Sequence, residues 1–210
     1  MNQKILKKKF QDSIRHIKLF REKKKINNKE FTLISNNCWG GLVSRDLNVS
    51  HKSPFVGLFI MTPDFIKLIS NFEYYMQQDL KFVDKSKYEN VNIQRAESTF
   101  PIGMLGDIEI DFQHYKTESE AYEKWNRRKN RMVWDNMYFK LAEKYECTYE
   151  HLVQFDNLPY KNKLVFTKNK YDNINSAVYI PDFQLKKEMY HYRRYFDIAH
   201  WLNTGEIKLK

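Results

Sequence analysis

Short apolar runs alternate along this chain with stretches of helical periodicity, and that alternation limits the folds available to it. The runs with the length and composition of buried strands cover residues 31–35, 55–60, 163–167 and 176–180. Residues 107–113 alternate polar and apolar side chains, as a strand with two unlike faces does, and residues 136–142 fit either a strand or a helix. The stretches with helical signals cover residues 62–78, 117–131, 148–155 and 195–203. This order predicts an α/β fold, a three-layer α/β/α sandwich with a largely parallel sheet.

Local signals indicate where several of these helices begin and end. Thr62-Pro63-Asp64 is a typical helix start, with Thr62 as N-cap, a proline in the first turn and a carboxylate at the positive end of the helix dipole. Thr117 and Glu120 have the spacing of a capping box, and Gly205 marks the end of the last helix. Residues 84–98 are the expected long surface excursion.

Length and composition indicate one domain in a reducing compartment. A chain of 210 residues with 42% hydrophobic content can build one well-packed core. No run of eighteen apolar residues occurs, and the N-terminus lacks the apolar segment of a secretion signal. Cys38 and Cys147 are far apart and in unlike contexts, which argues against a disulfide framework and a structural zinc site. These features predict a bacterial cytoplasmic protein.

Most of the net charge of +10 belongs to the N-terminal segment. Residues 1–25 contain ten Lys and Arg against two acidic residues, which gives +8 and leaves about +2 for the rest. Leu6, Phe10, Ile14 and Ile17 follow helical spacing, so residues 1–28 are expected to form a basic amphipathic helix ahead of a single α/β domain at 29–210. Such a helix can contact an anionic membrane at the inner face, or it can be solvated; without aromatic interleaving, nucleic acid is not the expected partner.

The most unusual stretch, residues 36–41 (NNCWGG), follows the first predicted strand. Ligands of open α/β sheets bind beyond the carboxyl ends of strands, and a helix N-terminus at that point favours an anion. Asparagine amides can donate and accept hydrogen bonds, while glycines permit positive φ and a close backbone approach. The stretch lacks the spacing of the dinucleotide fingerprint and of the P-loop. It is therefore either a binding cradle or a tight turn with a buried tryptophan and cysteine.

Cys38 could instead be a nucleophile, because thiols at helix N-termini ionise more readily than others. The side chains that could assist it are His114, His191, His200, Asp182 and Asp197. A cysteine beside a tryptophan is more often simply buried, so both interpretations stay open at this point.

Three carboxylates, Asp107, Glu109 and Asp111, share one face of the strand predicted at 107–113. They could hold Mg²⁺ or Mn²⁺ or supply a general base, and their repulsion would raise at least one pKa. The favoured alternative is a half-solvated strand with an acidic outer face. On a parallel strand His114, just past the strand's end, is better placed for chemistry than Asp107, and on an antiparallel strand the preference reverses.

Two basic segments complete the candidates. Arg128 shares a helix side with Trp125, and an arginine beside an aromatic ring suits a phosphate or a sugar–nucleotide. Arg131 is the second candidate on that helix, and Lys161 precedes a buried strand in a polar connection. Solvated charge and an Asx-turn are the simpler explanations.

Five stretches occur in a fixed order over residues 30–170: ISNNCWGG, SPFVGLF, FPIGMLGDIEIDFQHY, KWNRRKNRMVWDN and FDNLPYKNKLVFT. Together they resemble a bacterial family of domains of unknown function whose members are often labelled exopolysaccharide biosynthesis proteins. The resemblance implies a three-layer α/β/α domain and a setting in surface polysaccharide assembly, without a defined reaction. The basic N-terminal helix and the C-terminal tail lie outside it.

The leading hypothesis is a glycan-modifying transferase that uses a sugar–nucleotide or a lipid-linked saccharide. Asp111 or His114 would act as the base, and a divalent metal could take part. The expected ligand-binding residues are Asn36, Asn37, Trp39, Gly40, Gly41, Arg128, Arg131 and Lys161. The alternatives are a cysteine-dependent hydrolase or acyltransferase built on Cys38, and a non-enzymatic assembly scaffold.

Overall fold

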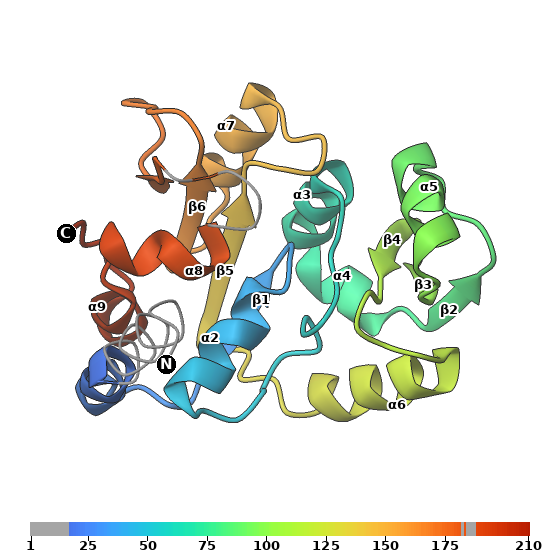
Figure 1. Cartoon of the computed structure of the whole chain (residues 1–210), viewed down its shortest axis with the longest axis horizontal. Helices are drawn as coiled ribbons and strands as arrows, with labels where there is room; N and C mark the ends of the chain where they lie inside the picture. The colour runs from blue at the N-terminus through green and yellow to red at the C-terminus, as the bar shows by residue number, and fades with distance from the viewer. Residues whose placement is uncertain (1–16, 182, 184–187) are drawn as a thin grey trace, which may run out of the picture.

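The predicted α/β/α sandwich is confirmed by a computed structural model that describes residues 17–181, 183 and 188–210 (Figure 1). Four parallel strands form the main sheet, sheet A, in the order β1-β5-β6-β7. Their bounds are β1 (Thr32–Ser35), β5 (Met137–Ala142), β6 (Lys163–Thr167) and β7 (Ala177–Tyr179). A smaller antiparallel sheet, sheet B, has the order β2-β3-β4. Its bounds are β2 (Leu80–Val83), β3 (Ile102–Leu105) and β4 (Ile108–Asp111).

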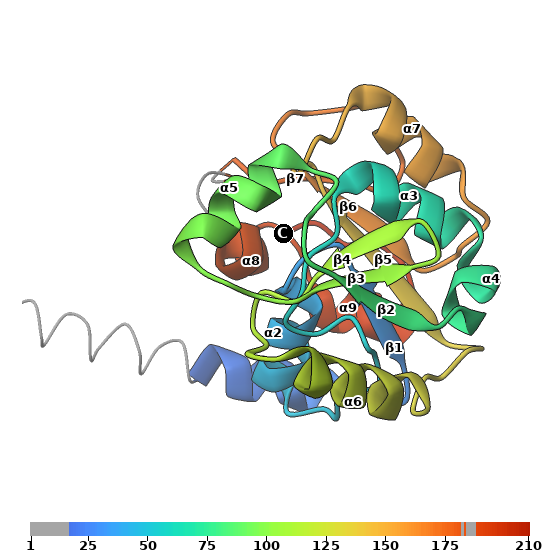
Figure 2. The same ribbon diagram turned by 90° about the vertical axis from the view of Figure 1, so that its right-hand side faces the viewer.

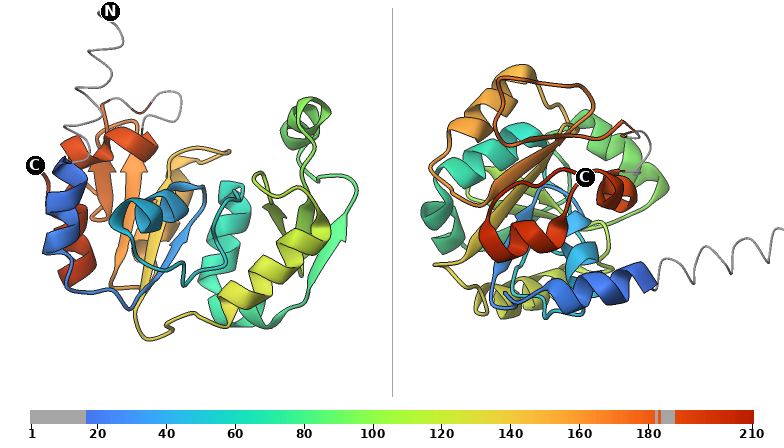
Figure 3. Two further views of the ribbon diagram at one scale, coloured as in Figure 1. Left: turned by 60° about the horizontal axis from the view of Figure 1, so that its bottom comes forward. Right: turned by 90° about the vertical axis from the view of Figure 1, so that its left-hand side faces the viewer.

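Helices cover both faces of sheet A. On one face lie α3 (Thr62–Ser70), α4 (Phe72–Gln77) and α7 (Tyr149–Asn157). On the other lie α2 (Trp39–Leu47), α8 (Glu188–His191), the 3-10 turn η1 (Tyr192–Arg194) and α9 (Ile198–Thr204). The helices beside sheet B are α5 (Glu89–Glu97) and α6 (Glu118–Lys129), and residues 17–25 are also helical (Figure 3).

The period of two along β5 assigns its side chains to two separate cores. Tyr138 and Ala142 face α2 and α9, whereas Phe139 and Leu141 face α3, α4 and α7. Strands of a parallel sheet are buried on both faces, which explains why these runs are almost continuously apolar. Residues 136–142, ambiguous in the sequence, are therefore resolved as a strand.

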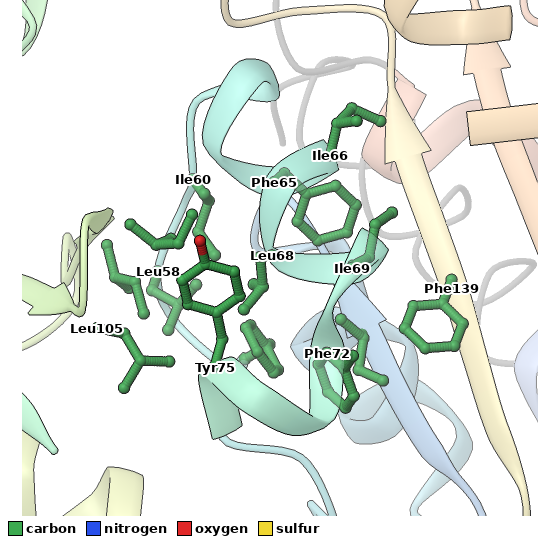
Figure 4. Close-up of a cluster of buried hydrophobic side chains, with 14 of the residues drawn as sticks. Leu58, Ile60, Phe65, Ile66, Leu68, Ile69, Phe72, Tyr75, Leu105 and Phe139 are labelled. Carbon is green, nitrogen blue, oxygen red and sulfur yellow. The ribbon is translucent and has the colours of Figure 1, made fainter. Parts of the chain in front are cut away.

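Helices α3 and α4 pack between the two sheets (Figure 4). Phe65, Ile69 and Phe72 lie toward Phe139 of β5, and Tyr75 lies on the side of Leu105 in sheet B (Figure 4). The helix expected over 62–78 is interrupted at Asn71, whose φ of −138° is not helical. Met61, and not Thr62, is the N-cap residue; the Thr62 hydroxyl donates instead to the Lys144 carbonyl at 2.6 Å.

The strand expected at residues 55–60 is wrong. The segment is buried, but it pairs through single residues with two different partners: Phe59 exchanges two 2.9 Å hydrogen bonds with Asp111, and Ile60 N donates to Asn36 O at 3.0 Å. It therefore joins the end of β1 to the end of β4 without becoming a strand of either sheet (Figure 2).

The other expected elements are present with shifted ends. The helices predicted at 117–131, 148–155 and 195–203 correspond to α6, α7 and α9, and β6 has its predicted bounds. Thr117 caps α6 by accepting from Glu120 N at 3.1 Å. The excursion at 84–98 contains α5, with Val91 as its buried residue.

Gly205 ends α9 with a φ of +78°, and a Cβ there would lie 2.1 Å from Asn162 Oδ1. Gly106, in the turn between β3 and β4, has a φ of +63° but ordinary contacts of 3.6 Å or more. Each Gly→Ala change imposes a left-handed conformation that costs about 1 kcal/mol. Gly205→Ala must also displace Asn162, whose amide donates to Met137 O. We expect Gly205→Ala to lower the free energy of unfolding by about 2 kcal/mol and Gly106→Ala by about 1 kcal/mol in urea titrations. Equal losses would contradict this packing.

Candidate functional site

A cavity of about 470 Å³ opens at the carboxyl end of β1. Its wall combines parts of the chain that are distant in sequence: residues 37–45 after β1, residues 51–59, Gln113 and His114 after β4, Tyr145 after β5, and α8. This is the edge of a parallel sheet where α/β proteins bind their ligands. Of the residues expected from the sequence, Asn37, Cys38, Gly41 and His114 line this pocket.

Asn37 is held in one orientation by the residues around it. Its side chain is 1% exposed, and its Oδ1 lies within hydrogen-bond distance of Ser35 Oγ (3.1 Å), Trp39 N (3.1 Å) and Lys140 Nζ (3.3 Å). Three donors around one oxygen identify that atom as the carbonyl of the amide. The amide nitrogen Nδ2 makes no hydrogen bond of ordinary geometry within the described residues, although Tyr145 lies beside it. Asn37 thus presents a buried donor at the pocket wall.

The neighbouring residues of the NNCWGG stretch serve the fold and not the pocket. Asn36 is buried and ties β1 to β5, because its Oδ1 accepts from Ala142 N at 2.9 Å. Trp39 is 0% exposed and packs edge-on against Phe166, with ring centroids 5.3 Å apart. Gly40 lies inside α2 over Leu33. Asn36, Trp39 and Gly40, which the sequence suggested as ligand-binding residues, do not line this pocket.

The glycine pair does not have the positive φ values that the sequence suggested. Gly40 and Gly41 both belong to α2, and neither has a positive φ. Gly41 is needed for a close approach, because a Cβ there would lie 2.9 Å from Cγ1 of Val56 in the opposite wall. The absent side chain therefore keeps two walls of the pocket in contact.

Positive groups gather on one side of the pocket. Arg45 of α2 and His51 line it, and Arg128 lies behind it, donating to the Tyr115 hydroxyl at 2.6 Å. Burial lowers the pKa of His51, and Arg128 and Arg45 lower it further. His51 is therefore neutral at pH 7, and the two arginines supply the local charge.

Aromatic rings form another part of the wall. Tyr145 stacks on Phe59 with ring centroids 5.3 Å apart, and Tyr190 of α8 lines the same cavity. Burial raises the pKa of Tyr145, which keeps its phenol protonated. Tyr145 and Glu146 have φ values of 57° and 63°, a left-handed backbone that side chains other than glycine rarely adopt. This left-handed turn follows β5, and Tyr145 within it lines the pocket.

Arg131 and Lys161 are not part of this site. Arg131 is exposed beyond the end of α6. Lys161 precedes β6 and so lies at the amino edge of sheet A, opposite the pocket, where it approaches the end of α9. Sequence alone does not show which edge of a sheet a loop occupies until the strand direction and bounds are known.

The three carboxylates near β4 do not form a metal centre. Asp107 is bonded to Lys67 and Tyr75 on the surface, whereas Glu109 accepts from Ser86 and from Lys87 N. No group of three or more His, Cys, Asp or Glu within residues 17–181, 183 and 188–210 is arranged to hold a metal ion. The expectation of a half-solvated acidic face is also wrong, because Glu109 and Asp111 are at most 1% exposed.

Asp111 is buried without a hydrogen bond to either oxygen from the described residues. Burial raises its pKa to about 8, with Glu109 and Asp64 adding to the shift and Arg95 opposing it. β4 is antiparallel to β3, which by the sequence argument favours Asp107 over His114, but His114 lines the pocket and Asp107 does not. Asp111 does not line the pocket, and its side chain is a buried acid beside Phe59, whose backbone it pairs with.

Of the described side chains proposed to assist Cys38, only His114 lines the pocket. His200 Nε2 lies 3.6 Å from Glu206, Asp197 caps α9, and His191 belongs to α8. Asp182 lies outside the described residues. Cys38 Sγ donates to Leu58 O at 3.6 Å, and neither Cys38 nor Cys147 forms a disulfide.

Sequence reasoning missed several residues around the pocket: Arg45, His51, Gln113, Tyr145, Lys140 and Glu188. The clearest signal was Lys140, a single charge within the apolar run MYFKLA of β5. A lysine inside a strand buried on both faces has to be paired or lose its charge, which marks the position as unusual.

The fold and this pocket define an α/β/α protein with a candidate ligand site at the carboxyl edge of its parallel sheet. The chain belongs to the family described as "Domain of unknown function (DUF1919)", which matches residues 8–204. An uncharacterised protein of Haemophilus influenzae (strain ATCC 51907 / DSM 11121 / KW20 / Rd) is 34% identical over 191 residues, 86% of this chain and 87% of that protein. The family predicted from the five motifs is confirmed. It covers more than residues 30–170, including most of the basic segment and the C-terminal helix.

The buried acid Asp111 generates a pH prediction. Between about pH 4, where the unfolded carboxyl ionises, and about pH 8, the folded carboxyl keeps its proton, so native stability is lost as pH rises through this window. In Asp111→Asn this loss is absent. We measure the free energy of unfolding by denaturation at a series of pH values. As pH rises across the window, we expect the difference in this free energy between the variant and the wild type to grow in the variant's favour by up to about 1.4 kcal/mol per pH unit. Asp107→Asn is the matched control and gains nothing, because Lys67 and Tyr75 lower the pKa of Asp107. A constant difference for Asp111→Asn would contradict the buried, protonated acid.

Proposed function

We propose that this protein is a transferase of glycan biosynthesis that binds a phosphate-bearing saccharide, a sugar–nucleotide or a lipid-linked sugar, in the pocket at the end of β1. The observation that carries this proposal is the orientation of Asn37. Its oxygen faces three donors inside the protein, and its Nδ2 is a buried donor at the pocket wall that makes no hydrogen bond of ordinary geometry among the described residues, with Tyr145 beside it. A buried donor is costly unless an acceptor meets it, and a ligand oxygen would supply that acceptor.

The charge around the pocket supports a phosphate. Arg45 lines the cavity with its side chain 63% exposed, and Arg128 lies within electrostatic reach of His51. Helix α2 begins at Trp39, so its amino end is directed at the same cavity. Arginine side chains and a helix N-terminus both stabilise a phosphate, the first by paired hydrogen bonds and the second by its dipole.

The remaining wall supports a saccharide. Phe59, Tyr145 and Tyr190 offer aromatic surface, and His51, Gln113 and His114 offer polar groups to hydroxyls. His114 takes the role of base toward an acceptor hydroxyl in this proposal, because it lines the pocket and Asp111 does not. The polysaccharide setting comes from the labels of the family resemblance and is part of the proposal.

A second candidate is a cysteine-dependent hydrolase or acyltransferase. The specific observation behind it is that Cys38, at the N-cap position of α2, lines the pocket together with His51 and His114. Covalent chemistry at Cys38 needs a thiolate and a nearby group to handle protons. Both candidates use the same cavity, so ligand identity and sulfur reactivity separate them.

A ligand screen tests the leading proposal. Thermal unfolding is measured with a panel of sugar–nucleotides, nucleotides and free sugars, with and without Mn²⁺. A ligand at one hundred times its Kd stabilises by about 2.7 kcal/mol. For such a ligand, Arg45→Ala should weaken binding by about tenfold, since a charge-assisted hydrogen bond contributes roughly 1.5–3 kcal/mol. Arg127→Ala is the matched control, an exposed arginine paired with Glu123 on α6 and away from the pocket. If no ligand of the panel stabilises the protein, the proposed saccharide-binding site in this pocket is ruled out.

We further propose that the basic N-terminal segment brings the protein to an anionic membrane. Ile17 and Phe20 are 54% and 57% exposed and lie three residues apart on the helix at residues 17–25. A groove of about 520 Å³ beside this helix collects six cations against two acids. The cations are Lys18, Arg21, Lys25, Arg193, Arg194 and Lys210. No helix among the described residues has the length and apolarity to cross a membrane. The part of the predicted amphipathic helix at residues 1–16 lies outside the described residues.

Vesicle co-sedimentation tests this contact. We expect binding to vesicles containing phosphatidylserine and none to phosphatidylcholine alone, weakening as salt rises because exposed charges are screened. The double variant Lys18→Gln/Arg21→Gln should bind more weakly, since each cation contributes about 1 kcal/mol near such a surface. Lys81→Gln/Lys85→Gln, two exposed lysines of sheet B and the turn after it, is the control. Equal binding to neutral vesicles, or binding that salt does not change, would argue against an electrostatic contact.

A further inference from the structure

A cationic groove lies between the helix at residues 17–25, the 3-10 turn η1 and residues 197 and 210. The helix runs beside α9, and its end is tied there because Asn203 Nδ2 donates to Lys25 O at 2.7 Å (Figure 3). The groove has a volume of about 520 Å³ and is lined by six cations and two acids. A hollow lined mostly by charges of one sign attracts ions of the opposite sign.

We propose that this groove binds the terminal phosphate of a lipid headgroup, a phosphate monoester or a diphosphate. The inference rests on the membrane contact proposed above and names the lipid chemistry that this contact recognises. A surface that responds only to negative charge would not distinguish such a lipid from phosphatidylserine.

The two acids of the groove are already engaged in the fold. Glu22 accepts from Arg193 Nε at 2.7 Å, and its side chain is 11% exposed. Asp197 caps α9 by accepting from Ala199 N and His200 N, each at 3.2 Å. Six positive charges against two negative ones leave a net charge of +4 around the groove.

Three cations of the helix at residues 17–25 face the groove. Lys18, Arg21 and Lys25 follow helical spacing, so they lie on one side of this helix. Their side chains are exposed and make no ion pair or hydrogen bond with the described residues. Arginine offers paired N–H groups to two phosphate oxygens, and lysine offers a mobile point charge. An anion in the groove therefore meets donors that are not already bonded.

The opposite wall of the groove is held in place by the fold. Arg193 is bonded to Glu22 and, through Nη1 at 3.2 Å, to Asp46 of α2. Lys210 Nζ donates to Arg193 O at 3.0 Å, and Lys210 N donates to Tyr195 O at 3.0 Å. A wall that is already ordered lowers the entropic cost of binding, which favours a defined site over a diffuse contact.

Apolar side chains beside the cations indicate a lipid as the source of the phosphate. An α-helix turns by about 100° per residue, so Ile17 and Phe20 lie on the sector of the helix next to Arg21. Both are more than half exposed. On a membrane such side chains enter the boundary between headgroups and acyl chains while neighbouring cations meet the phosphates. A nucleic acid or a free phosphate makes no use of them.

The experiment is vesicle co-sedimentation at one salt concentration with two kinds of phosphatidylcholine vesicle. The added anionic lipid is either phosphatidylserine, whose phosphate is a diester, or phosphatidic acid, whose phosphate is a monoester. The two compositions are matched in zeta potential, so a contact that responds only to charge binds both equally. We expect the wild type to bind the phosphatidic acid vesicles about tenfold more tightly, as one additional charge-assisted hydrogen bond provides.

Arg21→Gln/Lys25→Gln is the decisive variant, and Lys23→Gln/Lys24→Gln is its matched control. Both remove two charges from exposed positions of the same helix, but Lys23 and Lys24 do not line the groove. We expect both variants to bind phosphatidylserine vesicles more weakly by a similar factor. Only Arg21→Gln/Lys25→Gln should lose the tenfold preference for phosphatidic acid.

Inorganic pyrophosphate tests whether the phosphate group itself occupies the groove. At equal ionic strength, we expect pyrophosphate to release the wild type from phosphatidic acid vesicles at a lower concentration than sulfate does. Arg45→Ala should be released in the same way, because Arg45 lines the saccharide pocket and not the groove. If pyrophosphate binds but the vesicles show no preference, the groove takes soluble phosphate, and the lipid inference is overturned.

Equal binding to the two charge-matched vesicles would also overturn the inference, as would a preference that persists in Arg21→Gln/Lys25→Gln. An equal loss of preference in Lys23→Gln/Lys24→Gln would assign the effect to the charge of the helix and not to the groove. Equal binding that still weakens with salt leaves the general membrane contact in place, whereas no binding to either vesicle removes both proposals. The saccharide pocket takes part in none of these outcomes.

Discussion

The architecture of the pocket depends on a short hydrogen-bonded junction between the two sheets. Ile60 N donates to Asn36 O at the end of β1, and Phe59 exchanges two hydrogen bonds with Asp111 at the end of β4. A fourth bond, from His114 N to Gly57 O at 3.0 Å, continues the same contact. These bonds bring the residues after β4 against the loop after β1, and the cavity lies between them. Together with the packing of α3 and α4 between the sheets, this junction fixes sheet B relative to the NNCWGG loop.

Buried polar groups concentrate around this junction, which is where the structure departs most from a simple apolar core. Asn36 and Asn37 satisfy backbone and side-chain groups at the end of the sheet, whereas Asp111, Lys140 and Glu188 are buried ionisable side chains on either side of it. Such groups lower stability unless they are paired. Their grouping near one cavity, and the left-handed turn at Tyr145 beside it, is typical of a functional site.

The sequence predicts sheet A well and sheet B poorly, for a physical reason. Strands buried on both faces need continuous apolar runs, so β1, β6 and β7 are evident from composition. The strands β2 and β3 have four residues each. In β2 (LKFV) Leu80 is the buried residue, so its sequence contains no continuous apolar run that would identify a strand. The segment 55–60 reads as a strand because it is buried equally deeply, but its hydrogen bonds go to two sheets in turn. A sequence indicates that a segment is buried, but it does not indicate which strands the segment forms hydrogen bonds with.

The candidate site, too, could be predicted only in part from the sequence. The loop after β1 is identifiable because it follows a buried strand and contains amides and glycines, and Asn37, Cys38 and Gly41 do line the cavity. Asn36 and Trp39 share the same sequence signal, but their side chains are buried in the protein interior, and Gly40 packs over Leu33. His51 and Tyr145 come from loops placed by the junction and by a left-handed turn, neither of which has a local sequence signature.

We propose that a phosphate-bearing saccharide binds in the cavity beside Cys38. Protection of Cys38 from alkylation by the saturating ligand tests it most directly, with Cys147 in the same molecule as the reference. We expect the alkylation rate of Cys38 to fall in proportion to ligand occupancy while the rate of Cys147 stays constant. A ligand that stabilises the protein and leaves the Cys38 rate unchanged would place the binding site elsewhere and contradict the account.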